Sequence, residues 1–358
     1  LAAGMMDLAI APDDWDANPW LLNCQNGTIN LKTGKLQPFN KADYITRICN
    51  ASFDENCATP LWDTLLETIT KGDTDTIRYM QKALGYALTG DTSEQAMFML
   101  YGTGSNGKST FLNIFSAVMN TYAQSASSDA FMQKKNESVN NDIARLNGAR
   151  FVTAIEMEEN KRLAESLIKS MTGGDKLVTR FLYGEYFEYV PQFKVFLAAN
   201  HKPIIRDTTH SIWRRIKLMP FENTFTEANR DKHFANKIMA KEMPGILAWA
   251  VKGCLLWQRE GIQDPPSVKR ATTEYRTEMD SFATFFEECC EAREGVRVSN
   301  KMLRSSYDEW CKDNGEYALS QRPFSQKLLE MGFEKKRSAS TGAVEWIGLS
   351  IRGVASRL

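Results

Sequence analysis

The chain has 358 residues, of which 43% are hydrophobic and 25% charged, so it can bury a sizeable core and is predicted to form two to four globular domains. Its 44 basic residues balance its 44 acidic residues. This excludes a strongly basic protein, and any nucleic-acid binding must use locally arranged cations.

The seven cysteines form no paired C-x-x-C arrangement, which favours reduced thiols in a cytoplasm, either bacterial or that of a virus-infected host. No apolar run approaches the length of a membrane span, and residues 1–13 lack the basic flank of a signal peptide. The chain begins at Leu1 rather than Met, which suggests a fragment of a longer protein.

Residues 1–90 are predicted to form a collar of a β-hairpin followed by helices. Two apolar runs within residues 20–39 flank Asn26-Gly27, and Asn-Gly is the strongest short hairpin signal. Apolar residues then recur at helical spacing over residues 61–88, with a break at Gly72-Asp73. We expect these helices to have a packing role.

Residues 97–110, MFMLYGTGSNGKST, have the full spacing of a phosphate-binding P-loop, with a buried strand before it and a helix after it. Glycines let consecutive backbone N–H groups surround a phosphate, the Lys108 ammonium reaches the outer phosphates, and the Ser109 hydroxyl holds Mg²⁺. The helix adds its positive N-terminal end. The predicted nucleotide-binding residues are Gly102, Thr103, Gly104, Ser105, Asn106, Gly107, Lys108, Ser109 and Thr110.

Further elements predict an α/β sheet over residues 91–225. The polar stretch 124–141 is expected to be a surface loop with a short helix. A helix is predicted around residues 163–171, ending at Gly173-Gly174. Strands are predicted at 150–159, 194–200 and 215–221. Strands that alternate with helices indicate a sheet that binds nucleotide at its carboxyl edge.

Polar side chains follow two of these strands. Glu156 stands directly at one strand end and is the first choice for the acid that an ATPase needs to hold Mg²⁺ and polarise the attacking water, with Glu158 second. Asn200 ends the next strand, where its amide can orient the water or contact the γ-phosphate.

Arg214 and Arg215 precede the last strand of the predicted sheet. Arginine suits transition-state charge because its guanidinium is planar, always ionised and bidentate. In an oligomeric ATPase one such residue can enter the site of the neighbouring subunit. The sequence leaves open which of the two does so.

The rest of the chain is predicted to be a helical extension over residues 226–282 and a small module over residues 283–358, with a candidate boundary at Asp264-Pro265-Pro266. Short helical patterns and a final strand at 345–351 favour a winged-helix-like module. Lys335-Lys336-Arg337 is a candidate wing, although a short charge run is usually a solvated loop.

Five motifs in this order resemble the superfamily 3 helicases, specifically the phage and plasmid primase-helicase group that includes the poxvirus primase-helicase. They are GTGSNGKST (102–110), RFVTAIEMEE (150–159), the segment 168–194, LAANHKP (197–203) and WRRIKLMPF (213–221). The N-terminal NPWLLNCQNGTINLKTGKL and the C-terminal segment also look like that family's flanks, so the resemblance covers nearly the whole chain.

The resemblance implies an AAA+-like P-loop ATPase core and an ATP- and Mg²⁺-dependent DNA helicase, usually hexameric and moving 3′ to 5′ on single strands. Its partners would be single-stranded and forked DNA, identical chains, and a primase domain upstream of Leu1. The resemblance assigns Walker A to Lys108 and Ser109, Walker B to Glu156 and Glu158, the sensor to Asn200, the finger to Arg214 or Arg215, and a cation reaching the neighbour's nucleotide to Lys169.

The segment 175–190 resembles the hairpin that touches DNA in the channel of such helicases. Its residues 179–182 and 186–190 can pair around Tyr183-Gly184-Glu185. An aromatic beside Lys176 and Arg180 suits backbone tracking and base stacking on a single strand. Lys176, Arg180 and Tyr183 are therefore the candidate DNA-binding residues.

Two other functions stay open. One is a P-loop kinase for a small molecule, which would need neither the Trp213-Arg214-Arg215 element nor the long hairpin. The other is an origin-binding protein without motor activity, in which the C-terminal module binds duplex DNA and nucleotide only switches assembly.

Overall fold

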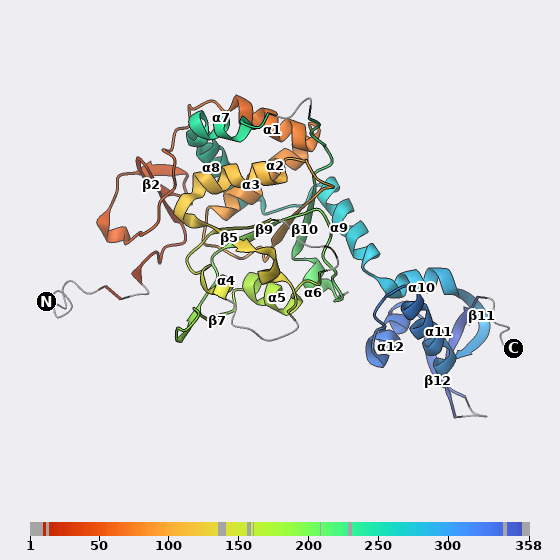
Figure 1. The fold of residues 1–358 in the computed structure, drawn as a ribbon. Helices are drawn as coiled ribbons and strands as arrows, with labels where there is room; N and C mark the ends of the chain where they lie inside the picture. The colour runs from red at the N-terminus through yellow and green to blue at the C-terminus, as the bar shows by residue number, and fades with distance from the viewer. Residues whose placement is uncertain are drawn as a thin grey trace. The chain divides into compact units, whose positions relative to one another are not determined.

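The computed structural model describes residues 10–11, 14–134, 141–155, 159, 161–207, 209–227, 231–338 and 342–352. The chain divides into two compact units, Leu1–Tyr275 and Arg276–Leu358 (Figure 1). The candidate boundary at Asp264-Pro265-Pro266 coincides with the start of helix α9, and the two units part further on, within that helix. The finer division into four segments stays a prediction.

A parallel five-stranded sheet forms the centre of the first unit, in the order β10-β4-β9-β6-β5. Four of these strands are largely buried, as expected for strands covered on both faces, and their prediction is confirmed. The strands are β4 (Met97–Tyr101), β5 (Ala123–Ser127), β6 (Phe151–Ile155), β9 (Lys194–Ala199) and β10 (Ile216–Pro220).

The prediction of a surface loop over residues 124–141 is wrong at its start, because β5 lies there. This strand pairs in parallel with β6, from Ala123 opposite Phe151 to Ser127 opposite Ile155. It occupies the edge of the sheet and buries only Ala126, so it lacks the apolar run that marks the central strands. The 3₁₀ turn η6 (Ser128–Phe131) follows it and is mostly buried.

Helices cover both faces of the sheet. Helix α3 (Lys108–Met119) connects β4 to β5, whereas α4 (Asn141–Ala144), α5 (Glu165–Gly173) and α6 (His210–Trp213) belong to connections that run back across the sheet in the opposite direction. Because parallel crossovers are right-handed, a reversal of direction moves the helix to the other face. Figure 1 shows this arrangement, with α3 on one side and α4, α5 and α6 on the other.

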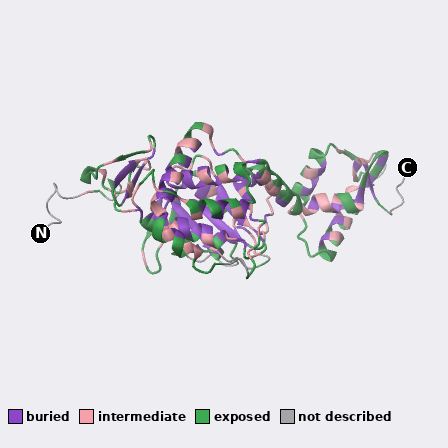
Figure 2. Cartoon of the chain, turned by 90° about the horizontal axis from the view of Figure 1, so that it is seen from above, coloured by how far each residue is buried: buried purple, intermediate pink, exposed green. Residues whose placement is uncertain are grey.

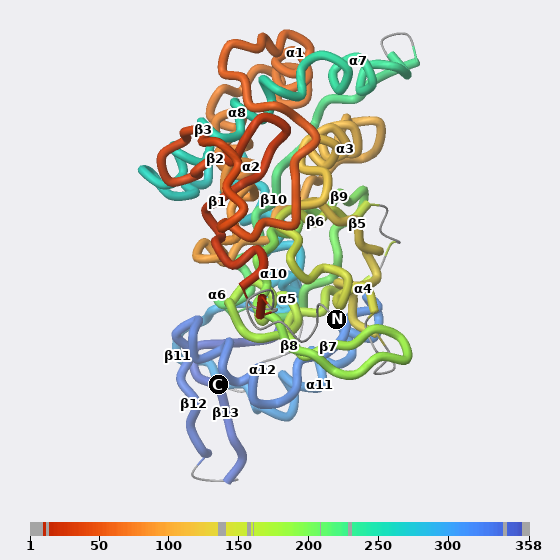
Figure 3. Tube along the Cα trace, turned by 90° about the vertical axis from the view of Figure 1, so that its left-hand side faces the viewer, coloured from red at the N-terminus to blue at the C-terminus, as the bar shows by residue number. Residues whose placement is uncertain are grey.

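The predicted N-terminal hairpin is confirmed. It forms an antiparallel sheet of β1 (Leu21–Cys24), β2 (Gly27–Asn30) and β3 (Lys35–Gln37), followed by the 3₁₀ turn η4 (Lys41–Asp43). This sheet lies beside helix α8 (Met243–Glu260) in Figures 1 and 3. The side-chain amide of Gln258 in α8 donates to the carbonyl oxygen of Leu31 at 2.8 Å, which ties the two together.

The helices around α3 share one core with the sheet (Figure 2). Their bounds are α1 (Pro60–Thr70), α2 (Thr74–Ala87), η5 (Asn120–Tyr122), α7 (Phe234–Lys241), α8 and α9 (Pro266–Glu278). Gly85 of α2 and Gly253 of α8 let these two helices touch, because a Cβ on Gly85 would lie 2.1 Å from the backbone nitrogen of Cys254. The predicted packing role of residues 61–88 is therefore confirmed.

Glu242 caps helix α1 from a distant part of the sequence. The residue is 4% exposed, and its carboxylate accepts hydrogen bonds from the backbone N–H groups of Leu61 at 3.0 Å and Trp62 at 2.8 Å. Glu242→Ala leaves both donors buried and unpaired, so we expect it to lower the free energy of unfolding by about 2 kcal/mol. Chemical denaturation measures this loss.

Glu67→Ala is the matched control, because Glu67 lies on the same helix with an exposed side chain. We expect it to change the free energy of unfolding by less than about 0.5 kcal/mol. Equal effects of the two substitutions would contradict the capping role of Glu242.

The described part of the second unit combines helices with an antiparallel sheet in the order β11-β13-β12. Its elements are α10 (Ser281–Cys289), β11 (Cys290–Ser299), α11 (Asn300–Asp313), α12 (Gln321–Glu330), β12 (Glu334–Arg337) and β13 (Val344–Ile351). The predicted helices and final strand are confirmed. Strand β12 carries Lys335, Lys336 and Arg337, all exposed, and β11 is also largely exposed and contains several charged residues. This explains why neither strand shows an apolar pattern.

All seven cysteines lie in described residues, and each is a free thiol. Among the helices in the described ranges, none combines the length and the apolar character needed to cross a lipid bilayer.

Candidate functional site

A cavity of about 620 Å³ lies at the carboxyl ends of β4, β9 and β6. Residues of the glycine-rich loop form one wall, and Asn200, the residue after β9, forms part of another. The predicted nucleotide-binding residues that line it are Gly104, Ser105, Asn106, Gly107, Lys108, Ser109 and Thr110, while Gly102 and Thr103 precede them in the same loop. The motif and the predicted strand-end amide are thus brought together.

The shape of the loop depends on its glycines. Gly104 and Gly107 adopt positive φ angles of 117° and 85°, which favour glycine. A Cβ on Gly102 would lie 2.4 Å from the carbonyl oxygen of Phe221, so a larger residue would push this neighbouring segment away. Helix α3 begins directly after Gly107, and its N-terminal N–H groups therefore face the same region.

Lys108 is the first residue of α3, and it is only 6% exposed. Its ammonium donates to the carbonyl oxygen of Gly102 at 2.7 Å and to Oδ1 of Asn106 at 3.2 Å. Burial lowers the pKa of this ammonium below its usual value. Neither of these two partner oxygens belongs to a carboxylate. The loop thus holds a cation at the cavity through uncharged acceptors.

The other walls of the cavity include segments that were not predicted as part of a site. They are Thr64, Leu65 and Thr68 of α1, followed by Phe225, Asp231, Lys232, Phe234 and Ala235. The hydroxyls of Thr64 and Thr68 donate to carbonyl oxygens one turn earlier in their own helix, at 2.7 and 2.6 Å. These residues follow no spacing that marks a nucleotide site, and only the fold brings them to the loop.

The predicted acids Glu156 and Glu158 lie outside the described residues. Ile155, the last residue of β6, lines the cavity. Over the described ranges, no three His, Cys, Asp or Glu side chains group in a way that could hold a metal ion.

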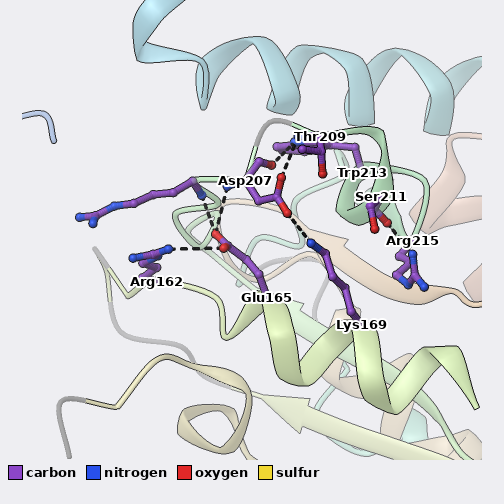
Figure 4. Close-up of polar contacts among 9 residues, drawn as sticks. Arg162, Glu165, Lys169, Asp207, Thr209, Ser211, Trp213 and Arg215 are labelled. Carbon is purple, nitrogen blue, oxygen red and sulfur yellow. Dashed lines mark hydrogen bonds and ion pairs between the residues drawn. The ribbon is translucent and has the colours of Figure 1, made fainter. Parts of the chain in front are cut away.

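Lys169 lies on α5, in a polar cluster that also involves the loop before α6 (Figure 4). Its ammonium pairs with the carboxylate of Asp207, whose other oxygen accepts from the backbone N–H of Thr209 at 2.8 Å. Burial acts to raise the pKa of Asp207, but the hydrogen bonds from Lys169 and Thr209 outweigh it and lower the pKa. Glu165, one turn before Lys169, accepts from the backbone N–H of Asp207 at 3.2 Å.

The two predicted finger arginines have different surroundings. Arg215 is 7% exposed, and it donates to Thr172 Oγ1 at 3.0 Å and to the carbonyl oxygen of Ser211 at 2.6 Å. Burial and the charge of Arg214 lower the pKa of Arg215. Arg214 is exposed and donates to the side-chain oxygen of Gln95. Arg215 therefore joins α5 to α6, whereas Arg214 lies at the surface of this unit.

The predicted hairpin in segment 175–190 is confirmed. Strands β7 (Leu177–Arg180) and β8 (Tyr186–Tyr189) pair antiparallel, with Arg180 opposite Tyr186. At its base, the Tyr189 hydroxyl donates to the carbonyl oxygen of Ile143 in α4 at 2.7 Å. The hairpin follows α5 after a left-handed Gly174, so the same helix carries Lys169 and leads into the hairpin.

The three candidate DNA-binding residues differ in their exposure and contacts. Tyr183 is 98% exposed at the turn of the hairpin. The Arg180 guanidinium lies 4.8 Å from the ring centroid of Tyr186, and the Lys176 ammonium lies 3.6 Å from a carboxylate oxygen of Glu188. Both cations thus have partners within the hairpin, and the most exposed side chain of the three is aromatic.

Three family models match successive parts of the chain. Residues 2–71 match "D5 N terminal like", residues 100–215 match a "Family of unknown function (DUF5906)", and residues 277–345 match "Poxvirus D5 protein-like". The first and last of these flank the region that carries the glycine-rich loop, Asn200 and the two arginines.

The curated relatives named here come from viruses. "Putative helicase 022R" of Frog virus 3 is 27% identical over 74% of this chain and 29% of its own length. A second "Putative helicase", from Acanthamoeba polyphaga mimivirus, is 26% identical over 86% of this chain and 35% of its own length. "Primase D5" of fowlpox virus is 23% identical over 64% of this chain and 30% of its own length. The chain thus spans about a third of the length of these relatives.

A solved structure has a similar fold. The NrS-1 C-terminal region superposes with a TM-score of 0.53, covering 84% of this chain and 78% of its own, at 11% sequence identity. This likeness concerns the fold, a mixed α/β architecture around a parallel five-stranded sheet. The D5-type family matches and the viral relatives confirm the resemblance drawn from the motifs, a likeness to primase-helicase proteins of the D5 type.

Proposed function

We propose that the chain is the ATP-driven motor of a DNA helicase, with an AAA+-like P-loop core that works in a ring of identical subunits. The observation that carries this proposal is a cavity bounded by the glycine-rich loop, Lys108 and Asn200 at the carboxyl edge of a parallel sheet. Nucleotides bind at this edge in open α/β sheets. The viral relatives named as helicases or primases support the choice of DNA over a small-molecule substrate.

In this proposal the triphosphate lies along the loop. The backbone N–H groups of residues 105–109, which include the N-terminus of α3, bind the phosphate oxygens, and the Lys108 ammonium reaches the outer phosphates. Thr64, Leu65 and Phe225 line the same cavity and would contact the nucleoside part. The chain's own contribution is to hold these groups in place before the charge of the transition state develops.

Mg²⁺ would be held by the Ser109 hydroxyl and by Glu156, with Glu158 as the second choice. Ser109 lines the cavity directly after Lys108, which fits a hydroxyl ligand beside bound phosphates. When bound, Mg²⁺ would neutralise phosphate charge. Asn200, which lines the same cavity, would orient the attacking water.

The second half of the site would come from a neighbouring subunit. Arg214, exposed beside α6, and Lys169 on α5 are the proposed cations. Lys169 would have to exchange its contact with Asp207 for a phosphate oxygen of the neighbour's nucleotide. A ring, hexameric by family resemblance, supplies the repeated contact that such a site requires.

The hairpin of β7 and β8 is proposed to contact single-stranded DNA through Tyr183, with Lys176 and Arg180 nearby. An exposed aromatic ring binds bases by stacking regardless of sequence, which suits a motor that moves along any strand. The second unit is proposed to be winged-helix-like, with β12 and β13 as its wing. Because the viral relatives are about three times longer, a primase domain in the same polypeptide is also a proposal.

ATP turnover measured with and without single-stranded DNA, beside the mass of the assembly, tests the proposal. We expect a multimer whose turnover rises when DNA is added. Tyr183→Ala should keep its ATP turnover but lose unwinding of a forked duplex, because the exposed ring is no longer present to engage the strand. Tyr317→Ala, which removes a 70% exposed tyrosine from the second unit, is the control and should unwind normally.

Other results would favour the alternatives. A monomer whose turnover ignores DNA would support a small-molecule kinase. Duplex binding that depends on nucleotide, without unwinding by the unmodified protein, would support an origin-binding protein. Normal unwinding by Tyr183→Ala would remove that side chain from the mechanism.

A further inference from the structure

The side chain of Asn106 is buried inside the glycine-rich loop, with 3% of the residue exposed. Its Oδ1 accepts hydrogen bonds from the Gly104 backbone N–H at 2.6 Å and from the Lys108 ammonium at 3.2 Å. Its Nδ2 donates to the carbonyl oxygen of Asn223 at 2.6 Å. One short side chain therefore contacts a loop N–H, the cation of the site and a segment more than a hundred residues away.

These partners explain why the residue is an asparagine. The Gly104 N–H and the Lys108 ammonium are both donors and need an oxygen, whereas the Asn223 carbonyl needs a donor. A carboxamide supplies both at this length. Aspartate lacks the N–H donor and adds a negative charge, and alanine lacks both groups.

The contact with Asn223 belongs to a longer association between the loop and residues 221–225, which follow strand β10. The backbone N–H of Phe221 donates to the carbonyl oxygen of Tyr101 at 2.7 Å, just before the loop. The backbone N–H of Phe225 donates to the carbonyl oxygen of Ser105 at 2.8 Å, inside the loop. Asn106 thus adds a side-chain hydrogen bond to Asn223, which lies between the two residues, Phe221 and Phe225, that form the backbone hydrogen bonds.

We propose that Asn106 is a positioning residue for nucleotide binding. It holds the Lys108 ammonium and the Gly104 N–H in the arrangement that lines the cavity, and it fixes the loop to residues 221–225. The inference rests on the proposed function, because it concerns the same loop. A loop already ordered by the protein's own hydrogen bonds loses less entropy when it binds a phosphate chain.

The substitution Asn106→Ala removes the acceptor and the donor together. We expect it to raise the Kd for MgATP about tenfold or more, the range that follows from losing a hydrogen bond to a charged group. The KM should rise more than kcat falls, because Asn106 positions the loop and does not touch the reacting atoms. Equilibrium binding of MgATP to the full chain, and steady-state turnover, measure the two effects.

The substitution Asn106→Asp gives a readout that a general loss of packing would not produce. The carboxylate keeps an acceptor for Lys108 and Gly104, but its negative charge opposes the triphosphate. Its MgATP affinity should therefore increase as the pH falls and the carboxyl group becomes protonated, whereas the unmodified chain and Asn147→Ala should lack this increase. Asn147 is an exposed residue outside the cavity and serves as the matched control.

An unchanged or lower Kd in Asn106→Ala would overturn the inference, and so would a Kd of Asn106→Asp that follows the unmodified chain at every pH. The test with Asn106→Asp compares the MgATP affinity of one variant at different pH values, so it remains valid even if Asn106→Ala folds poorly. Absence of MgATP binding by the unmodified chain would overturn the proposed function and this inference together. Binding by the unmodified chain with no effect of either substitution would overturn the inference alone.

Discussion

Lys108→Ala is expected to reduce ATP turnover by roughly two to three orders of magnitude, the usual cost of removing one preorganised group that stabilises transition-state charge. The reason lies in the position of the ammonium, which is buried in the loop and held by two oxygens of the loop itself. Alanine has no charge to offer the outer phosphates. Phosphate release from purified protein at saturating MgATP measures the loss.

Lys71→Ala is the matched control for this substitution. Lys71 is an exposed lysine that pairs with Glu222 at 3.3 Å, both side chains being 58% exposed, so its removal should leave turnover unchanged. Normal turnover in Lys108→Ala would mean that hydrolysis occurs elsewhere in the molecule. Equal losses of turnover in both variants would show that removing any lysine charge lowers turnover, whatever its position.

The sequence predicted the central strands well because they are buried on both faces, and continuous apolar runs are a local signal. Strand β5 carries the sequence AQSAS at the edge of the sheet, where the pairing of backbone groups with β6 replaces apolar burial. Strands β11 and β12 were missed for the same reason, since they are largely exposed and rich in charge. Local pattern identifies a strand only when its side chains must be apolar.

The candidate site shows a similar limit. Loop residues 102–110 and Asn200 could be predicted because each stands next to a recognisable strand end. Thr64 and Phe225 could not, since they come from α1 and from the segment after β10 and meet only in the folded chain. Asn106 was part of the predicted motif, but its bond to Asn223 depends on tertiary packing.

Arg214 and Arg215 are adjacent and chemically identical, so sequence alone could not divide their roles. Arg215 is buried and Arg214 is exposed, so we propose Arg214 as the finger, and the second large expected effect follows from this proposal. Arg214→Ala is expected to fold normally and bind MgATP but to lose turnover by about three orders of magnitude or more, as arginine fingers do when removed. Arg215→Ala should instead lower the free energy of unfolding by about 2 kcal/mol, because Thr172 and Ser211 lose a buried charged donor.

Mixing experiments decide whether Arg214 acts on a neighbouring subunit. Arg214→Ala protein keeps Lys108, and Lys108→Ala protein keeps Arg214, so a mixed ring contains some sites with both groups. Turnover should therefore reappear when two inactive proteins are combined, with a maximum at an intermediate ratio. No recovery at any ratio would contradict a finger acting between subunits. If the Arg215→Ala protein is folded but inactive while the Arg214→Ala protein has normal turnover, the finger is Arg215, contrary to what their burial indicates.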